Sequence, residues 1–407
     1  MIRRTGVCRW GVGAVAAALA LALGAQPGGS QGPIRIGEIN SYSGVGAAFT
    51  VPYRNAVEMA FEEINAQGGL LGRKAEVIFR DDKLKPDEGI KHAEELVTAE
   101  KVHFLMGTFS SAVGLAVSEF ARKNKFLFLA AEPLTEALTW QKGHRYIFRV
   151  RPNTWQQGRI LAERAAKLPH KTYANIGPDY EYGHKAWEGF WNRLKELRPD
   201  VRVVTEYWPK LGAGEYSSYI NGILQAKPDA VYTSLFGSDW IAFVKQARPF
   251  GLFDKAFVIG ILLGEPEYID PLGKEAPEGM LVTGYPWYDI TAPAHQEFVA
   301  RYMRRFDRPP FLGSLVGYVT ALSLAEGIRK AGTLDTERVI NAMEAMTVNT
   351  PIGPVTYRPF DHQSTMGAWV GTTRIDPKLG RGVMVDWEYI PGEIVLPSRE
   401  EVERMRR

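Results

Sequence analysis

The sequence predicts an α/β protein with two lobes, each built on a doubly wound parallel sheet. Segments typical of strands and of helices alternate along nearly the whole chain, as they do in parallel βαβ units. With 407 residues the chain is longer than a single hydrophobic core usually serves, so we expect two domains of ordinary size.

The first βαβ unit, residues 33–82, sets the pattern. An apolar strand over 34–39 runs into a loop of small residues that ends at Phe49. The next apolar residues recur at helical spacing up to Ala66, and Pro52 suits the first turn of this helix because an N–H has no partner there. Open parallel sheets bind ligands at loops that follow their strands, so this loop is a candidate site.

The same alternation continues along the chain. In the first series we expect strands over 75–80, 103–107 and 126–130, with helices over 92–99 and 113–123. In the second series we expect strands over 172–176, 201–206, 230–233, 256–260 and 279–283, with helices over 154–167, 183–197, 217–226 and 239–250. Three later helices are predicted over 294–306, 314–331 and 336–346, and the Arg- and Glu-rich carboxyl-terminal end is expected at the surface.

Residues 1–25 have the features of a cleaved export signal. Three arginines open the segment, an apolar run over 12–23 follows, and small residues at its end suit a signal peptidase. The run is too short to span a bilayer comfortably. Arg3 and Arg4 leave the twin-arginine route open as an alternative to general export. We therefore expect a soluble protein of the periplasm, with a linker over 26–33.

Composition argues against several function classes. The formal net charge of +3 comes from the three arginines of the export signal, so the rest of the chain is neutral and gives no support for nucleic-acid binding. The single cysteine, Cys8, lies in that signal, so the remainder has no thiol or disulfide chemistry. Histidines are scattered singly and show no metal-ligand spacing, so no metal is expected.

Two glycine motifs are similar to cofactor and catalytic motifs but do not fit them. Gly44 and Gly46 follow a strand, yet Phe49 stands where the dinucleotide fingerprint needs a third glycine, and the helix is expected to start late, at Pro52. Residues 28–32 match Gly-x-Ser-x-Gly but precede the first strand, whereas a nucleophile elbow joins a strand to a helix. We therefore predict no catalytic residue, no cofactor and no enzyme activity.

Ser110 and Ser111 carry the strongest chemical signal. The preceding strand ends at Gly107 and a helix begins near Ala112, so the serine hydroxyls and the free N–H groups of the first turn converge at the positive end of the helix dipole. Such a place binds a carboxylate without an arginine. A helix cap without a ligand is the alternative interpretation.

Residue by residue, the opening segment 33–82 resembles the periplasmic substrate-binding proteins of the branched-chain amino acid uptake family, and the resemblance continues to about Trp387. It implies the type I periplasmic binding protein fold with a hinge of three crossings. It also implies a monomer that closes on a small-molecule ligand and delivers it to a membrane ABC permease. The parts expected on this pattern are 34–149 and 285–360 for the first lobe, 150–284 for the second, and 361–407 for the second lobe's return and the carboxyl-terminal tail.

The resemblance also assigns a ligand site. Ser110 and Ser111 match the family's cradle for the substrate carboxylate, and Phe49 matches an aromatic residue that packs on the substrate. Tyr182 matches a tyrosine that closes on the substrate. The remaining expected contacts are aromatic residues near strand ends and the second crossing, which together form a cage: Phe109, Phe236, Tyr285 and Trp287.

Glu132, Pro133 and Leu134 depart from the family pattern, which has small or hydroxyl residues there. Two interpretations of Glu132 stay open: it meets a hydroxyl or an amine of the ligand, or it pairs with an arginine of a lobe. Pro133 cannot offer a backbone N–H to the ligand.

Leu262 is the departure with the largest consequence. In leucine-type carriers an acid at this place pairs with the substrate ammonium, and a buried ammonium without a partner is costly. Unless Glu132 or Glu265 substitutes, we expect an aromatic or apolar carboxylate without an α-ammonium. The alternatives are a true branched-chain amino acid binder, a sensory protein that docks on a membrane receptor, and a secreted enzyme.

We predict that the mature protein begins near residue 25, because the apolar segment is short and is followed by small and polar residues. Amino-terminal sequencing of the exported protein checks this. An intact Met1 in the periplasmic fraction would contradict it.

Overall fold

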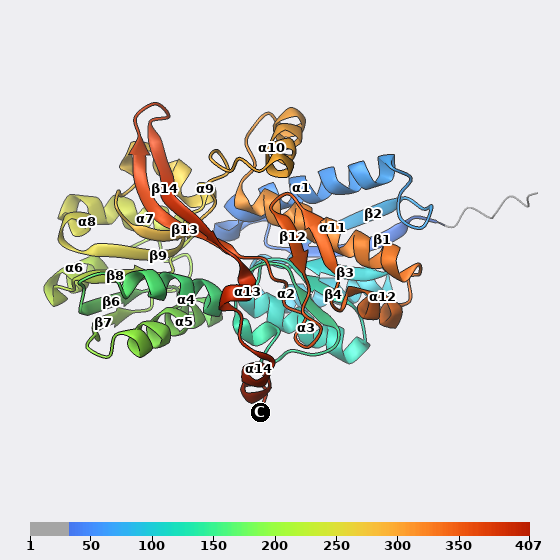
Figure 1. Cartoon of the computed structure of the whole chain (residues 1–407), viewed down its shortest axis with the longest axis horizontal. Helices are drawn as coiled ribbons and strands as arrows, with labels where there is room; N and C mark the ends of the chain where they lie inside the picture. Colours follow the sequence, from blue (N-terminus) through green and yellow to red (C-terminus); the bar gives the residue numbers. More distant parts are fainter. Residues whose placement is uncertain (1–31) are drawn as a thin grey trace, which may run out of the picture. The chain divides into compact units, whose positions relative to one another are not determined.

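Two β-sheets organise residues 32–407, the part of the chain that the computed structural model describes (Figure 1). We call the first sheet with its helices the first lobe, and the second sheet with its helices the second lobe. The predicted export signal, Cys8 and most of the Gly-x-Ser-x-Gly segment lie outside the described residues. Within them, no helix is both long and apolar enough to cross a membrane.

The first sheet has five parallel strands in the order β2-β1-β3-β4-β5. Their bounds are β1 (Ile34–Asn40), β2 (Ala75–Asp81), β3 (Phe104–Gly107), β4 (Phe128–Ala130) and β5 (Ile147–Arg149). Every residue of β3, β4 and β5 is buried, as is typical of strands covered on both faces. The strand order reverses between β1 and β3, and this switch point is where open α/β sheets bind ligands.

The helices of the first lobe come from two distant parts of the chain. They are α1 (Ala47–Ala66), α2 (Pro86–Thr98) and α3 (Ser111–Asn124), then α10 (Pro293–Phe306), α11 (Leu312–Ala331) and α12 (Thr336–Met343). A short hairpin of β11 (Thr347–Thr350) and β12 (Gly353–Thr356) follows them.

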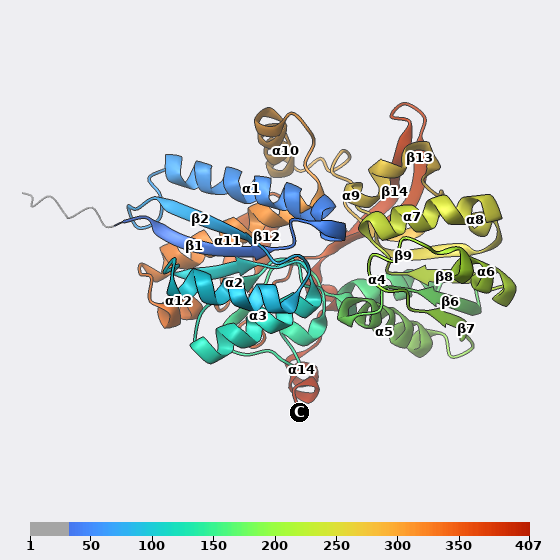
Figure 2. The same ribbon diagram turned by 180° about the vertical axis from the view of Figure 1, so that it is seen from behind.

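Helix α11 lies along α1 because two glycines let their backbones approach closely (Figure 2). A Cβ atom at Gly313 would lie 2.2 Å from the carbonyl oxygen of Phe49, and one at Gly317 would lie 2.3 Å from that of Tyr53. Any larger residue at either place would push the helices apart. A late segment of the chain thereby helps to complete the core of the first lobe.

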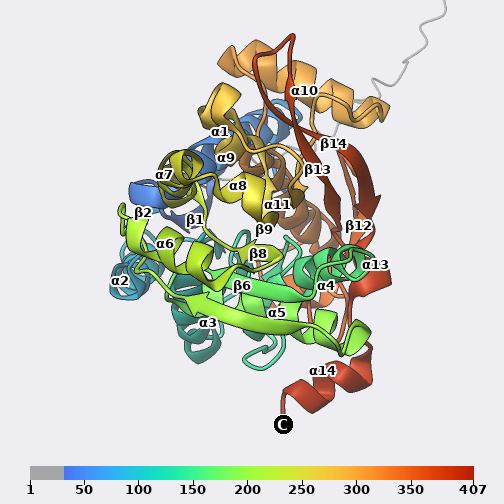
Figure 3. The ribbon, with the colours of Figure 1, turned by 90° about the vertical axis from the view of Figure 1, so that its left-hand side faces the viewer.

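The second sheet has seven strands in the order β14-β13-β10-β9-β8-β6-β7 (Figure 3). The parallel part consists of β6 (Thr172–Ile176), β7 (Arg202–Tyr207), β8 (Ala230–Thr233), β9 (Phe257–Gly264) and β10 (Leu281–Gly284). Strands β13 (Ala368–Asp376) and β14 (Arg381–Ile390) add to it antiparallel.

The longer helices of the second lobe are α4 (Thr154–Ala165), α5 (Glu181–Leu197), α6 (Ser217–Ala226) and α7 (Gly237–Ala247). Shorter ones are α8 (Leu252–Lys255), α9 (Pro266–Ile269), α13 (Gly392–Val395) and α14 (Arg399–Met405).

The predicted fold class is confirmed, but several predicted element bounds are wrong. Helix α2 begins at Pro86, six residues before the predicted start at residue 92, and two further differences bear on the site. Helix α1 begins at Ala47, and Pro52 lies inside it, so the helix follows the loop directly and gives up one backbone hydrogen bond at the proline. Strand β9 runs beyond Gly260 to Gly264 and contains Leu262, whose φ is +73°. The N–H of Leu262 donates to the Thr283 hydroxyl at 2.9 Å, and this bond supports the irregular pairing of β9 with β10.

The carboxyl-terminal end is exposed only in part. Val402 of α14 is fully buried, and Arg406 donates from its guanidinium to the carbonyl oxygens of Thr139, Trp140 and Phe360 at 2.9 to 3.2 Å. The sequence predicted a surface segment because its residues are charged. One of those charged side chains instead anchors the end of the chain.

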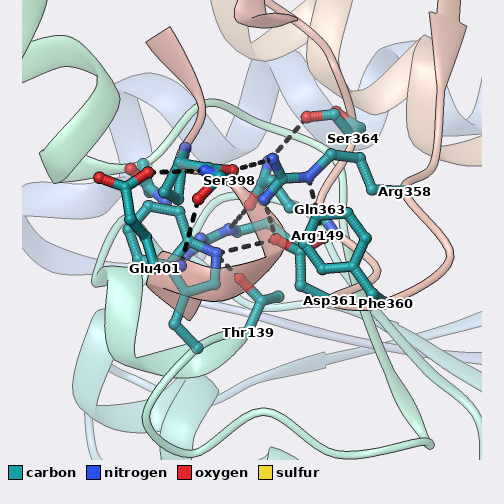
Figure 4. A network of polar contacts seen from close by, with 12 residues as sticks. Thr139, Arg149, Arg358, Phe360, Asp361, Gln363, Ser364, Ser398 and Glu401 are labelled. Atoms are coloured by element: carbon teal, nitrogen blue, oxygen red, sulfur yellow. Dashed lines mark hydrogen bonds and ion pairs between the residues drawn. The ribbon is translucent and has the colours of Figure 1, made fainter. Parts of the chain in front are cut away.

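A buried arginine joins the first lobe to the segment that precedes β13 (Figure 4). Arg149 donates to Gln363 Oε1 at 2.6 Å, to Thr139 Oγ1 at 3.0 Å and to the carbonyl oxygen of Thr135. Its backbone also pairs with the same segment, since its N–H donates to the His362 carbonyl at 3.1 Å. Burial lowers the pKa of Arg149 to about 9. The guanidinium and the backbone of Arg149 therefore join two chain segments that pass between the lobes, the end of β5 and residues 362–363.

We predict that Arg149→Met lowers the free energy of unfolding by about 3 to 5 kcal/mol, because it leaves several buried oxygen acceptors without a donor. Urea unfolding measures the change. Arg145→Met is the control: its ion pairs with Glu337 and Glu344 are largely exposed, so it should cost less than about 1 kcal/mol. Equal small losses in the two variants would contradict the role of Arg149.

Candidate functional site

A buried cavity lies where the carboxyl ends of strands from the two sheets face each other. The first lobe and its exit toward α4 contribute Phe109, Ser111, Glu132, Leu134 and Arg151. The second lobe contributes Tyr180, Tyr182, Phe236 and Leu262. The volume of this cavity is about 10 Å³, which is room for about one water molecule. Both lobes therefore supply walls to one small site.

The backbone after β3 turns sharply and places Ser111 at the cavity. Gly107 has a φ of +107°, and a Cβ atom there would lie 2.4 Å from Glu38 Oε1, so glycine is required. Thr108 follows with a φ of +60°, and α3 then begins at Ser111. The result is a helix amino terminus that faces the cavity with no acidic residue in its first turn.

The Ser111 hydroxyl is free to donate to a ligand. Its oxygen accepts a hydrogen bond from the backbone N–H of Thr135 at 3.1 Å, which leaves the hydroxyl hydrogen available. Ser111 is 1% exposed. An oxygen of a bound carboxylate could accept from this hydroxyl and benefit from the positive end of the α3 dipole.

Aromatic rings form a continuous wall from the first lobe to the second. The ring centroids of Phe49 and Phe109 lie 5.7 Å apart, and those of Phe109 and Phe236 lie 5.6 Å apart across the cleft. The wall continues edge to face from Phe236 to Tyr182 at 5.5 Å, and then to Tyr180 at 5.8 Å. Such a wall suits a flat apolar ligand body.

Arg151 lies between two buried glutamates from different lobes. Its guanidinium donates to Glu132 Oε2 at 3.1 Å and to Glu265 Oε1, and its charge lies 4.8 Å from the ring centroid of Phe49. Glu132 follows β4, whereas Glu265 follows β9. All three charged side chains are at most 3% exposed. The group is therefore an ion-pair cluster that joins the lobes beside the cavity.

The environment of these glutamates favours their protonated form. Burial raises the pKa of Glu132 to about 8, against the opposing attraction of Arg151. Burial raises the pKa of Glu265 well above its ordinary value, again opposed by Arg151. Glu267, on α9, has its pKa raised by burial to about 7, although its Oε1 accepts from the Gly313 N–H at 2.7 Å.

A family model described as periplasmic binding protein matches residues 33–377. The chain belongs to the periplasmic binding protein family. The resemblance that the sequence suggested is thereby confirmed. A leucine-, isoleucine-, valine-, threonine- and alanine-binding protein of Pseudomonas aeruginosa is 26% identical over 323 residues, which are 79% of this chain and 84% of that protein.

Solved structures share the fold of this periplasmic binding protein. A solute-binding protein of an ABC transporter from Rhodopseudomonas palustris, solved with 3,4-dihydroxybenzoic acid, has a TM-score of 0.79 at 24% identity and covers 88% of this chain and 98% of its own. A second solute-binding protein from R. palustris, solved with benzoate, has a TM-score of 0.77 at 21% identity and covers 88% of this chain and 97% of its own. Similarity at these identities establishes the architecture.

The structure brings most of the predicted site residues to one place. Seven of them line the cavity: Phe109, Ser111, Glu132, Leu134, Tyr182, Phe236 and Leu262. Phe49 lies behind Phe109 and contacts Arg151 through its ring. Of the two interpretations of Glu132, the structure shows the pairing with an arginine, yet its Oε1 has no partner and the residue still lines the cavity.

Besides Phe49, four predicted site residues do not line the cavity. Ser110 precedes α3 as its cap residue, and Pro133 packs against Gly114, where a Cβ atom would lie 2.5 Å from the proline ring. Tyr285 is fully buried and its hydroxyl bonds to His295 Nε2 at 2.6 Å. Trp287 is half-buried beside Tyr288. Their contact with a ligand stays a prediction.

Sequence reasoning missed Arg151 and Tyr180, and it missed the pairing of Glu265. Arg149 and Arg151 stand two residues apart at the end of an apolar strand, and this was the signal that could have marked them as buried. Tyr180 is the cap residue of α5, and Tyr182 lies in the first turn of the same helix, so the sequence could have indicated that the two side chains are neighbours.

Proposed function

We propose that this periplasmic binding protein is an extracytoplasmic solute-binding protein that captures a small carboxylate between its lobes and delivers it to an ABC permease. The observation that carries the proposal is the cavity lined by both lobes, with the Ser111 hydroxyl and the amino terminus of α3 at one wall. A ligand that contacts both walls stabilises the closed arrangement in proportion to the contacts it makes only there.

The remaining walls of the cavity suit a ligand with an aromatic or apolar body. Phe109, Phe236 and Tyr182 present ring faces and edges, and Leu262 presents an apolar side chain. Burial of an aromatic ring contributes at about 25 cal/mol per Å² of apolar surface. The two R. palustris proteins of the same fold, which bind a benzoate and a dihydroxybenzoate, support this ligand class.

A branched-chain amino acid is the second candidate, and one observation favours it. Glu132 lines the cavity and its Oε1 has no partner, so this oxygen is a possible acceptor for a substrate ammonium. The P. aeruginosa relative, named for leucine, isoleucine, valine, threonine and alanine, agrees with it. Leu262, which takes the place of the family's usual acid, opposes it.

We predict that benzoates and phenylpropenoates raise the melting temperature more than aliphatic acids, leucine or valine do. At a ligand concentration of about 100 Kd the expected stabilisation is about 2.7 kcal/mol. A thermal-shift panel of these compounds measures it. Stabilisation by leucine or valine alone would show that an amino acid is bound and that Glu132 has taken over the ammonium site.

We predict that Ser111→Ala weakens binding of the best acid in that panel by roughly tenfold to a hundredfold, because it removes a hydrogen bond worth about 1.5 to 3 kcal/mol to a charged group. Titration calorimetry measures the affinity. Ser118→Ala is the matched control: Ser118 is a buried serine of the same helix that bonds to His144, away from the cavity. Equal affinity of Ser111→Ala and the wild type would leave Ser111 as a structural residue only.

A further inference from the structure

The cluster of Glu132, Arg151 and Glu265 lies beside the cavity and connects the two lobes. We call these three residues the Arg151 clasp. Glu132 belongs to the first lobe, Glu265 to the second, and the guanidinium bonds to both. Helix α9 makes another contact across the cleft through Glu267, whose carboxylate accepts from the Gly313 N–H of α11. The Arg151–Glu265 and Glu267–Gly313 contacts run from one lobe to the other, so separating the lobes there breaks them.

The clasp buries more carboxyl groups than its cation can neutralise. Glu132, Glu265 and Glu267 are each 1% exposed, and each has one oxygen without a hydrogen-bond partner. Among residues 32–407, the charged groups that act on these three carboxyls are Arg151 and the carboxyls themselves. The other titratable groups that face them are phenols: Tyr53 on α1, Tyr182 on α5, Tyr268 on α9 and Tyr285 after β10.

The positive charge of one guanidinium balances the negative charge of one carboxylate. A second ionised carboxylate in the same buried place would be desolvated without compensation, and a carboxyl group avoids that cost by binding a proton. We propose that closing of the lobes takes up protons at the Arg151 clasp, so that ligand capture is coupled to pH. This inference rests on the hinge closing of the proposed function and adds its regulation.

The direction of this pH dependence follows from how the carboxyls ionise in the open and in the closed protein. In open lobes the carboxyls face water and ionise near their ordinary pKa of about 4.3. In the closed structure burial raises the pKa of Glu132 to about 8 and of Glu267 to about 7, and that of Glu265 well above its ordinary value. A group whose pKa rises on closing favours the closed state at low pH, and this preference is lost as the pH rises through the closed-state pKa. The ratio of closed to open protein should fall by up to about tenfold per pH unit for each proton taken up.

Two fluorescent labels, one on each lobe, can measure this ratio directly. Lys85, after β2, and Lys210, after β7, are both exposed and lie beyond the carboxyl ends of strands in opposite lobes. The chain beyond Cys8 has no cysteine, so Lys85→Cys and Lys210→Cys give two specific attachment points. Energy transfer between the labels is recorded from about pH 5 to about pH 9, with and without benzoate. We expect the closed fraction to fall as the pH rises.

Glu265→Gln separates the clasp from other causes of pH dependence. The amide keeps a hydrogen-bond acceptor for Arg151. Glu132 is then the only carboxylate bonded to the guanidinium, so it can stay ionised in the closed state. The dependence of the closed-to-open ratio on pH should therefore decrease by about one proton per closing event. Glu181→Gln is the matched control. Glu181 accepts from Thr135 Oγ1 across the cleft at 2.7 Å but is only half-buried, so its loss should shift closing about equally at every pH.

The outcomes distinguish this inference from the proposed function. A closed fraction that does not change with pH, or an equal slope in Glu265→Gln and wild type, overturns proton uptake at the clasp. A closed fraction that changes with pH but not with benzoate supports the clasp and counts against the aromatic-acid ligand. A slope reduced in Glu265→Gln and unchanged in Glu181→Gln supports the inference.

Discussion

The burial of guanidinium groups where the first lobe ends is the constraint on which the rest of the structure depends. Arg149 and Arg151 lie two residues apart, yet they bond to different partners. Arg149 bonds to backbone and neutral side-chain oxygens of the first lobe and the returning segment, whereas Arg151 bonds to carboxylates of both lobes. One guanidinium therefore joins the first lobe to residue 363, and the other joins the two lobes across the cleft. Residues 149–151 therefore contact both lobes and the segment that returns to the second sheet.

Much of the fold was predictable from the sequence because its signals are local. Alternating strand and helix patterns depend on neighbouring residues, and so do the sharp turn at Gly107 and the serine at the start of α3. That Phe109, Tyr182 and Phe236 lie near one another was predictable because each follows a strand, and the carboxyl ends of parallel strands share one edge. Where several such signals agreed, the cavity was found.

The rest was not predictable because it depends on contacts between distant residues. Arg151 pairs with Glu265, 114 residues later in the chain, and no local pattern connects them. Leu262 was placed after its strand because the bulge that extends β9 depends on a bond to Thr283 in the next strand. Pro52 was taken as a helix start by its usual preference, but the packing of α11 on the first turns of α1 outweighs that preference.

Thr135 makes one hydrogen bond to Ser111 at the cavity and one to the second lobe. Its N–H donates to the Ser111 hydroxyl, and its own hydroxyl donates to Glu181 of α5. A ligand that draws the Ser111 hydroxyl toward itself makes that oxygen a better acceptor for Thr135, since linked hydrogen bonds polarise one another. Thr135 therefore stands between the wall that Ser111 supplies and the second lobe, and a shift of this one residue would be felt at both places.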